Sequence, residues 1–279
     1  MQKKLFIAGL VMMGTVFSNA WGEDVNAQVS IPKEFTLKTI SGFEIGLQAY
    51  NYKYEEKVDG AFFMSNKGTK YGATVGAAKT LDDEYYIKGE ARFGTGDVKY
   101  SSASGTGSVS DDVYEIRMIA GDEANVKNYL LASYIGLGYR LLNNDLRDLG
   151  AGGYRRMSQY LYIPIGVTHR FWVIDKVSRI STSIEYDYFV KGEQKSYLSD
   201  VNPTYAALFG DQVNKQKKGY GARISSSYER KNWSAGLFFN YWNIADSEIN
   251  SYVVYPFIIS FMEPKNETTE MGLEIKYRF

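Results

Sequence analysis

The chain has no cysteine and only one histidine among its 279 residues. It therefore has no disulfide framework, no thiolate metal site and no thiol nucleophile. It also lacks a surplus of either charge, because 32 Lys and Arg residues balance 32 Asp and Glu residues. A nucleic-acid binder needs a basic surplus to meet phosphates, so we expect no nucleic-acid partner.

Long apolar runs are absent after residue 20. A membrane-spanning helix needs about 18 apolar residues, and the longest later run, 252–262, is shorter and contains Pro256. Aromatic residues, by contrast, are plentiful, with 24 Tyr, 15 Phe and 4 Trp. An exported chain of this kind is either soluble or a closed β-barrel, the other fold that can span a bilayer.

The first residues predict export. Lys3 and Lys4 precede an uncharged, mostly apolar stretch, and Ser18 to Ala20 supplies small residues for a cleavage site. This pattern predicts a secretory signal peptide over residues 1–20. Cleavage after Ala27 and a buried N-terminal helix are the weaker alternatives. Residues 21–42 are expected to form a periplasmic lead-in.

The rest of the chain alternates between apolar and polar residues, as strands with one apolar face do. In residues 85–93 one parity is Tyr, Ile, Gly, Ala and Phe, while the other is Tyr, Lys, Glu and Arg. Ten such segments occur, at about 43–54, 68–79, 85–94, 113–121, 130–142, 158–172, 179–190, 218–229, 233–244 and 267–279. Their lengths fit the ~9–11 residues of a tilted membrane strand with some overhang.

The connections between these segments are alternately long and short. Outer-membrane barrels have short periplasmic turns and long extracellular loops, so residues 43–279 are predicted to form an all-β, transmembrane, antiparallel up-and-down β-barrel of ten strands. A twelve-strand alternative adds 35–40 and 252–262, but it would move the long loops 55–67 and 95–112 to the periplasmic side. We therefore assign 252–262 to the fifth extracellular loop. The tyrosines near the strand ends are expected to form interfacial girdles: Tyr54, Tyr71, Tyr85, Tyr139, Tyr188, Tyr241 and Tyr277.

The C-terminus carries a resemblance to a known class. The chain ends in Phe279, and apolar residues precede it at two-residue steps: Met271, Leu273, Ile275 and Tyr277. This ending resembles the assembly signal of small Gram-negative outer-membrane β-barrel proteins of 8–12 strands. The resemblance implies location in the cell outer membrane, contact with its lipid and recognition of the C-terminal strand by the barrel-assembly machinery.

Charged residues on the more polar parity are predicted to line the lumen. They are Lys88, Glu90, Arg92, Glu115, Arg117, Arg140, Glu185, Asp187, Arg223, Glu274 and Lys276. A ten-stranded barrel is only slightly wider than one that side chains fill, and unpaired buried charges are costly. The charges are therefore expected to pair and largely plug the lumen. A narrow porin-like channel for small solutes or ions is the alternative.

The extracellular loops are the second candidate region. Tyr154, Arg155, Arg156, Tyr252 and Phe257 are candidates for binding an extracellular ligand, and packing of the loops on one another is the alternative. The Ser/Gly-rich stretch 101–110 is expected to be a mobile loop. An envelope structural or surface-binding role follows from this interpretation.

No catalytic residue, metal site or cofactor is predicted. Omptin-like proteases are barrels of similar size that carry a His–Asp pair and an Asp pair at the extracellular rim. Here the single His169 is expected near the periplasm on the lipid-facing parity, too far from the rim to act as a general base there. The acidic pairs Asp82–Asp83, Asp111–Asp112 and Asp145/Asp148 are interpreted as solvated turn residues, because they lack the spacing of a calcium loop.

Overall fold

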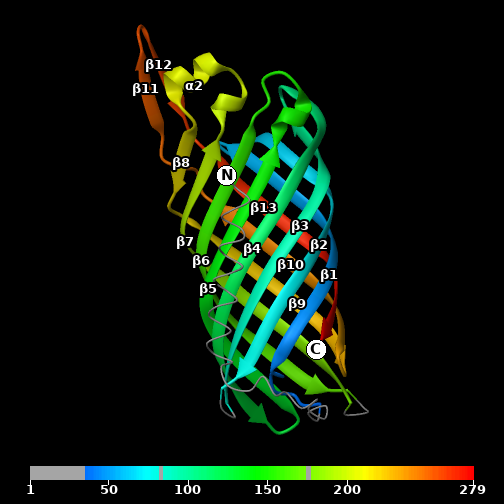
Figure 1. Ribbon diagram of the computed structural model, residues 1–279. Coiled ribbons are helices and arrows are strands. Elements are labelled where there is room, and N and C mark those ends of the chain that lie inside the picture. Colours follow the sequence, from blue (N-terminus) through cyan, green and yellow to red (C-terminus); the bar gives the residue numbers. More distant parts are fainter. Residues whose placement is uncertain (1–34, 82–83, 174–176) are drawn as a thin grey trace, which may run out of the picture. The chain divides into compact units, whose positions relative to one another are not determined.

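Ten antiparallel strands close into a tilted barrel in the computed structural model, which describes residues 35–81, 84–173 and 177–279 (Figure 1). The barrel strands are β1 (Gly42–Val58), β2 (Ala61–Thr80), β3 (Tyr85–Ser102), β4 (Gly105–Val126), β5 (Tyr129–Asp145), β6 (Arg155–Trp172), β7 (Ser178–Ser196), β9 (Gly219–Arg230), β10 (Trp233–Ile244) and β13 (Lys265–Arg278). The predicted fold class and strand number are confirmed.

The strands follow one another around the barrel, and the first and last strands pair to close it. Glu44 is opposite Arg278 and Glu56 is opposite Asn266 in the β1–β13 ladder. Pairing of β6 with β7 completes the ring. Closure leaves no unpaired edge in the barrel wall, which is the condition for crossing lipid with strands.

The barrel wall separates an apolar exterior from a polar interior, residue by residue. On β13, Met271, Leu273 and Ile275 are 54–59% exposed and point outward. Glu270, which precedes them on the opposite parity, is fully buried. Ile135 and Leu137 on β5 and Leu47 on β1 are likewise more than half exposed. This alternation gives the barrel the lipid-facing surface that the sequence predicted.

The strands extend further above the membrane than predicted. Segments 55–67 and 95–112, which were expected to be long loops, are the ends of strands joined by tight turns at Asp59–Gly60 and at 103–104. Asp59 and Gly60 have φ values of 50° and 81°, which a tight turn requires. The Ser/Gly-rich stretch 101–110 therefore forms a β-hairpin. Above the bilayer water is on the outside of the wall, so strands can pair there without an apolar face.

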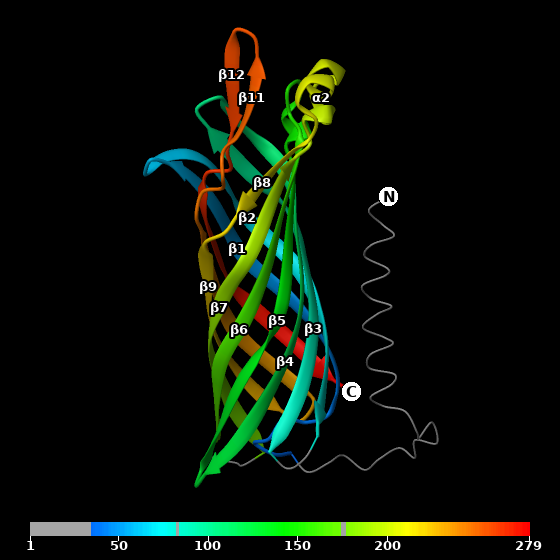
Figure 2. The same cartoon turned by 90° about the vertical axis from the view of Figure 1, so that its left-hand side faces the viewer.

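The other extracellular connections contain short elements. A 3₁₀ helix, η1 (Leu146–Leu149), lies between β5 and β6, and η2 (Leu198–Asp200), α2 (Pro203–Phe209) and β8 (Gln212–Gln216) lie between β7 and β9. β8 pairs with the upper part of β7. Between β10 and β13, β11 (Asn250–Val254) and β12 (Phe257–Phe261) form a separate two-stranded hairpin, as Figure 2 shows, so segment 252–262 belongs to the fifth extracellular loop.

The predicted signal peptide and most of the predicted lead-in lie outside the described residues. Among the described residues, no helix has the length and apolar character required to cross a membrane.

Candidate functional site

The structure places all eleven predicted lumen charges on the inward face of the barrel wall. Five of them are deeply buried, with Arg92, Glu115, Arg140, Glu185 and Asp187 at most 6% exposed, and the other six are partly buried. Inward-facing residues of successive strands stand at similar heights, so opposite charges from β3, β4, β7, β9 and β13 meet across the lumen. The lumen is thus a site built from ion pairs.

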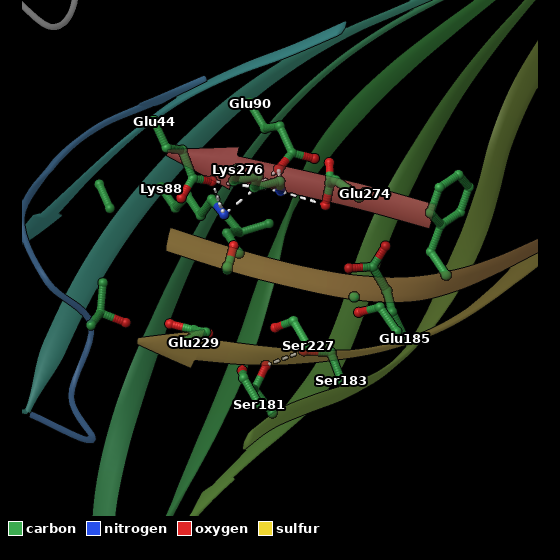
Figure 3. A pocket seen from close by; sticks show the side chains of 18 of the residues that line it. Glu44, Lys88, Glu90, Ser181, Ser183, Glu185, Ser227, Glu229, Glu274 and Lys276 are labelled. Carbon is green, nitrogen blue, oxygen red and sulfur yellow. Dashed lines mark hydrogen bonds and ion pairs between the residues drawn. The ribbon is translucent and has the colours of Figure 1, made fainter. Parts of the chain in front are cut away.

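In the periplasmic half, these pairs form a chain along one wall. Figure 3 shows Lys276 between Glu90 and Glu274, with Nζ–carboxylate distances of 3.3 and 3.0 Å. Lys88 contacts Glu44 at 2.7 Å. On the neighbouring strand, Arg117 continues the chain, at 3.3 Å from Glu90 and 2.6 Å from Glu185.

A cavity of about 230 Å³ lies beside this charged wall. Its other wall comes from β7, β9 and β10 and carries small hydroxyl side chains, including Ser181, Ser183 and Ser227 (Figure 3). Because a water molecule occupies about 30 Å³ in the liquid, the cavity has room for several waters with polar partners on both sides.

The middle of the lumen is filled instead. Arg92 and Arg140, from β3 and β5, both point at Glu270 on β13 with nitrogen–oxygen distances of 2.6 Å. The side chains of Arg140 and Glu270 are fully buried and that of Arg92 is 5% exposed. Asn240 donates a further hydrogen bond to Glu270 at 3.0 Å. This cluster crosses the lumen, because β3 and β5 are not neighbours of β13 in the barrel wall.

A second charged group packs against aromatic rings at the same level. Arg223 bridges Asp187 at 2.6 Å and Glu115 at 3.1 Å, and Tyr162 donates a hydrogen bond to Glu115 at 2.7 Å. The guanidinium lies over the rings of Tyr162 and Trp242, 5.3 and 5.5 Å from their centroids. Trp242 has no exposed surface. Rings and paired charges together leave this level of the lumen packed.

Further pairs continue to the extracellular rim. Lys70 forms an ion pair with Asp111, which also accepts hydrogen bonds from Asn66 at 3.3 Å and Asn144 at 3.1 Å. The interpretation of Asp111 as a solvated turn residue is therefore wrong. Asp111 is 2% exposed inside the lumen, because β4 begins at Gly105, well before its predicted start at residue 113.

At the rim, one guanidinium serves two carboxylates. Arg156 contacts Glu263 at 2.7 Å and also pairs with Glu56, while the Tyr54 hydroxyl donates to Glu56 at 2.8 Å and to Glu263 at 3.2 Å. Burial raises the pKa of Glu263, which lies outside the strands, to about 8; Arg156 opposes the shift and Glu56 adds to it. Tyr54 is 5% exposed in the lumen, so its predicted place in an outer girdle is wrong.

A segment that precedes β1 lies in the periplasmic mouth of the barrel. Residues 36–41 belong to the same compact unit as the barrel. Leu37 packs against Ile119 and Leu130 inside the lower end. Arg170 donates to the Leu37 carbonyl at 3.3 Å, and Arg179 donates to the carbonyls of Thr36 and Lys38. The end of the predicted lead-in thus enters the lumen, which no feature of the sequence had indicated.

His169 lies where its parity predicted. It follows Val167 and Ile165 on the outer face of β6, near the periplasmic end of that strand, and its ring contacts Tyr129 and Phe171 at centroid distances of 5.1 and 5.4 Å. The acidic rim residues are at the opposite end of the barrel, so the chain brings no histidine to them.

The five predicted loop-binding residues do not form one exposed surface. Arg156 points into the lumen, Tyr154 packs against the lumen aromatic cluster, and Arg155 pairs with Asp200 at 2.8 Å. Tyr252 and Phe257 lie on the β11–β12 hairpin, and of these Phe257 is 66% exposed.

Two other predictions concern metals and assembly. Among the described residues, no group of three or more His, Asp or Glu side chains is arranged to hold a metal ion.

The residues of the predicted assembly signal lie on the outer face of β13 or directly after it, and Phe279 is 68% exposed.

Sequence reasoning missed several lumen residues, of which Glu270 is the most central. Glu270 shares its parity with Glu274 and Lys276, so continuing the alternation by two steps would have found it. Glu56 and Arg156 were missed because the segments above the predicted strands had been interpreted as loops, whereas Lys70 lies within the predicted strand 68–79 and was overlooked there.

Comparison with known proteins identifies the fold. No protein-family model matches the sequence, and no curated protein matches it. Among solved structures, the outer membrane protease OmpT from Escherichia coli is 11% identical, with 88% of this chain and 100% of OmpT covered and a TM-score of 0.53. The translocator domain of the autotransporter NalP from Neisseria meningitidis is also 11% identical, with 99% and 98% covered and a TM-score of 0.40. Neisserial surface protein A is 13% identical, with 86% and 98% covered and a TM-score of 0.38.

At these identities the likeness shows the fold alone, and the OmpT comparison is the one that supports it. The closed ten-stranded wall, its apolar outer belt and its polar lumen agree with that likeness. The chain therefore has the fold of an outer-membrane β-barrel, and this fold agrees with the predicted location in the outer membrane.

Proposed function

We propose that this chain is a non-enzymatic outer-membrane barrel whose lumen is closed and which acts through the segments at its extracellular end, as an envelope structural or surface-binding protein. The observation that supports this proposal is the buried cluster of Arg92, Arg140 and Glu270, which crosses the lumen. A solute crossing the lumen would have to separate these pairs, and an unpaired buried charge costs several kcal/mol.

Planar-bilayer recording tests the closed lumen. The purified barrel is expected to give no stable single-channel openings. The double variant Arg140→Ala and Trp242→Ala removes two fully buried side chains from the filled level, and it is expected to conduct. Stable openings of the unmodified barrel, with ion selectivity that changes when Arg92 or Arg117 is neutralised, would overturn the proposal.

A narrow channel for small solutes or ions is the second candidate. The cavity of about 230 Å³ favours it, because a polar vestibule with room for several water molecules already occupies the periplasmic half. The same recordings distinguish the two functions, since a channel conducts without any substitution.

An omptin-like protease is the third candidate and the least supported. Catalysis at the rim needs a base within hydrogen-bond reach of the substrate, and the one histidine lies near the periplasmic end. The variant His169→Ala tests this candidate. We expect any peptidase activity of the purified barrel to be unchanged in the variant, which would exclude the omptin-like mechanism; loss of that activity would support it.

We further propose that β13 is the strand by which the barrel-assembly machinery recognises the chain. Met271, Leu273 and Ile275 form a continuous apolar outer face on this strand, and Phe279 ends it. Replacing Phe279 by Ser is expected to lower the amount of folded barrel in the outer membrane, with little effect on the stability of the folded fraction because that side chain is exposed.

A further inference from the structure

The β11–β12 hairpin stands apart from the barrel wall. Its two strands pair only with each other in the part of the chain that the structure describes, with Val253 opposite Ile258 and Tyr252 opposite Ile259. In both views it reaches further from the periplasmic end than α2 or the other extracellular elements (Figures 1 and 2). The hairpin is therefore the part of the barrel that first meets anything facing the cell surface.

The base of the hairpin is fixed to its neighbours. The Glu248 amide donates to the Lys215 carbonyl at 3.1 Å, and the Asn250 side chain donates to the Val213 carbonyl at 2.9 Å. Above these bonds, the rings of Tyr252 and Phe261 pack on Phe209 of α2, with centroid distances of 5.9 and 5.5 Å. These contacts orient the hairpin and leave its tip without a partner among the described residues.

The tip exposes large apolar side chains in every direction. Val253 and Ile258 are 79% and 72% exposed on one face, Phe257 is 66% exposed on the other face, and Tyr255 is 94% exposed in the turn. No charged residue lies between Ile249 and Met262. Single exposed apolar residues are ordinary, but a contiguous group of this kind marks an interaction site.

The arrangement distinguishes between occupants. A protein partner docking on one face would leave the opposite face in water, and a second copy pairing along a strand edge would leave both faces exposed. A lipid bilayer surrounds what enters it and covers both faces together. Tyr and Phe also favour the interface, where their rings meet lipid and a hydroxyl meets water.

We propose that the hairpin tip inserts into the interface of a phospholipid bilayer that faces the extracellular end of the barrel, and so attaches the cell surface to another membrane. This inference rests on the proposed function, because it names the partner of the extracellular segments. The tip has three residues in each arm, and at about 3.3 Å per residue it reaches about 10 Å, which matches the depth of interfacial elements.

Charge contributes little to this attachment. Near the base, exposed Lys215, Lys217 and Lys218 are largely offset by exposed Asp246 and Glu248, and Lys217 pairs with Glu248. Insertion is therefore driven by burial of apolar surface, and neutral lipid is sufficient for it.

Vesicle flotation tests the proposal. The full-length barrel, held in amphipol, is mixed with vesicles of phosphatidylcholine alone or of phosphatidylcholine with a minority of phosphatidylglycerol, and it is expected to float with both. The triple variant Tyr255→Ser, Phe257→Ser and Ile258→Ser is expected to lower partitioning by about tenfold or more, because three large apolar side chains are lost.

Leu208→Ser is the matched control. Leu208 is 54% exposed on α2 at the same end of the barrel, so its replacement removes an apolar side chain outside the tip and leaves flotation unchanged. A heat-dependent gel shift shows that each variant is folded. In a separate variant, Phe257→Trp, vesicles are expected to shift the emission to the blue, and lipids with brominated chains are expected to quench it.

Each other outcome overturns the proposal. Failure of the unmodified barrel to float, or unchanged flotation of the triple variant, removes the lipid contact. Flotation with anionic vesicles alone replaces apolar insertion by electrostatic binding. A dimer that the triple variant loses identifies a second copy as the occupant. The closed-lumen proposal is tested separately by planar-bilayer recording. If the barrel conducts, that proposal fails, but the result of the vesicle flotation is not affected.

Discussion

The two halves of the lumen share one wall of strands but are filled differently. In the middle and the extracellular half, Trp242, Tyr160 and the pairs around Glu270 fill the lumen, and a cavity near Asn144 measures only about 20 Å³. In the periplasmic half, serines on β7, β9 and β10 take the place of large side chains, and a cavity of about 230 Å³ results. Strand number therefore sets the diameter of the barrel, while the choice of inward residues decides whether it is closed.

Removal of Glu270 is expected to have the largest effect. Glu270→Ala leaves the guanidinium groups of Arg92 and Arg140 buried without their main partner, and breaking such a buried pair costs about 3–5 kcal/mol. Denaturant unfolding of the detergent-held barrel measures this loss. In the open half, Glu274→Ala removes a carboxylate that is 21% exposed, and Lys276 keeps Glu90 as a partner. That control is expected to cost no more than about 1 kcal/mol. Equal losses would mean that the two halves do not differ in packing.

The rim cluster above the packed half predicts a pH dependence. The pKa of Glu263 is raised to about 8 by burial, from an ordinary value of 4.5. Between these values the folded barrel holds a proton that the unfolded chain has released, so stability falls as the pH rises from about 4.5 to about 8. Glu263→Gln fixes the neutral form and is expected to remove this fall in denaturant unfolding followed over the same range. The effect is smaller than that of losing Glu270, because Arg156 keeps Glu56 as a partner.

A matched control for the pH prediction is available on β13. Glu267→Gln replaces a carboxylate that is 27% exposed, and it is expected to leave the fall in stability in place. Stability that stays level over this range in the unmodified barrel would show that Glu263 is ionised in the folded state.

Glycines in the wall provide a third contrast between the halves. A Cβ atom at Gly138 would collide with the buried ring of Tyr162, whereas one at Gly76 would meet only the flexible Glu44 side chain, at 3.0 Å. Gly138→Ala is therefore expected to destabilise the barrel by about 1–3 kcal/mol in denaturant unfolding, as overpacking does. Gly76→Ala is expected to be close to neutral, since Glu44 can move toward the cavity. A similar cost at both positions would indicate a fixed periplasmic network.

Strand parity made most of the fold predictable from the sequence. Because an inward residue and its neighbours two positions away share a face, the alternation identified ten strands and placed Arg92, Arg117 and Glu185 in the lumen. It could not show where a strand ends above the bilayer, since both faces can be polar there. For this reason the roles of Asp111 and Tyr54 were predicted wrongly. The two arginine partners of Glu270 come from strands that are distant around the ring, and residue spacing along one strand carries no information about contacts across a lumen.

The entry of residues 36–41 into the periplasmic mouth also lay beyond sequence reasoning. Several of the contacts there are hydrogen bonds from Arg170 and Arg179 to backbone carbonyls, which any residue type can accept. Only Leu37 has a side chain in the lower apolar cluster. Leu37 and Ile40 are the two apolar residues of this segment, and two such residues give no pattern that distinguishes a plug from a linker.

The smallest expected effect concerns access to the cavity through the periplasmic mouth. It is measured as a change in the rate at which a cysteine in the cavity is labelled. Since the chain has no cysteine, a single Ser227→Cys substitution reports on the cavity alone. Loss of a hydrogen bond to a charged group costs about 1.5–3 kcal/mol, so Arg179→Ala, which releases the carbonyls of Thr36 and Lys38, is expected to speed labelling by a small charged thiol reagent by about tenfold or more. Ser158→Cys, in the extracellular half and 7% exposed, is expected to label at the same rate with or without Arg179. If Arg179→Ala accelerates both sites alike, the packed level does not separate the halves, and if it accelerates neither, residues 36–41 do not control entry.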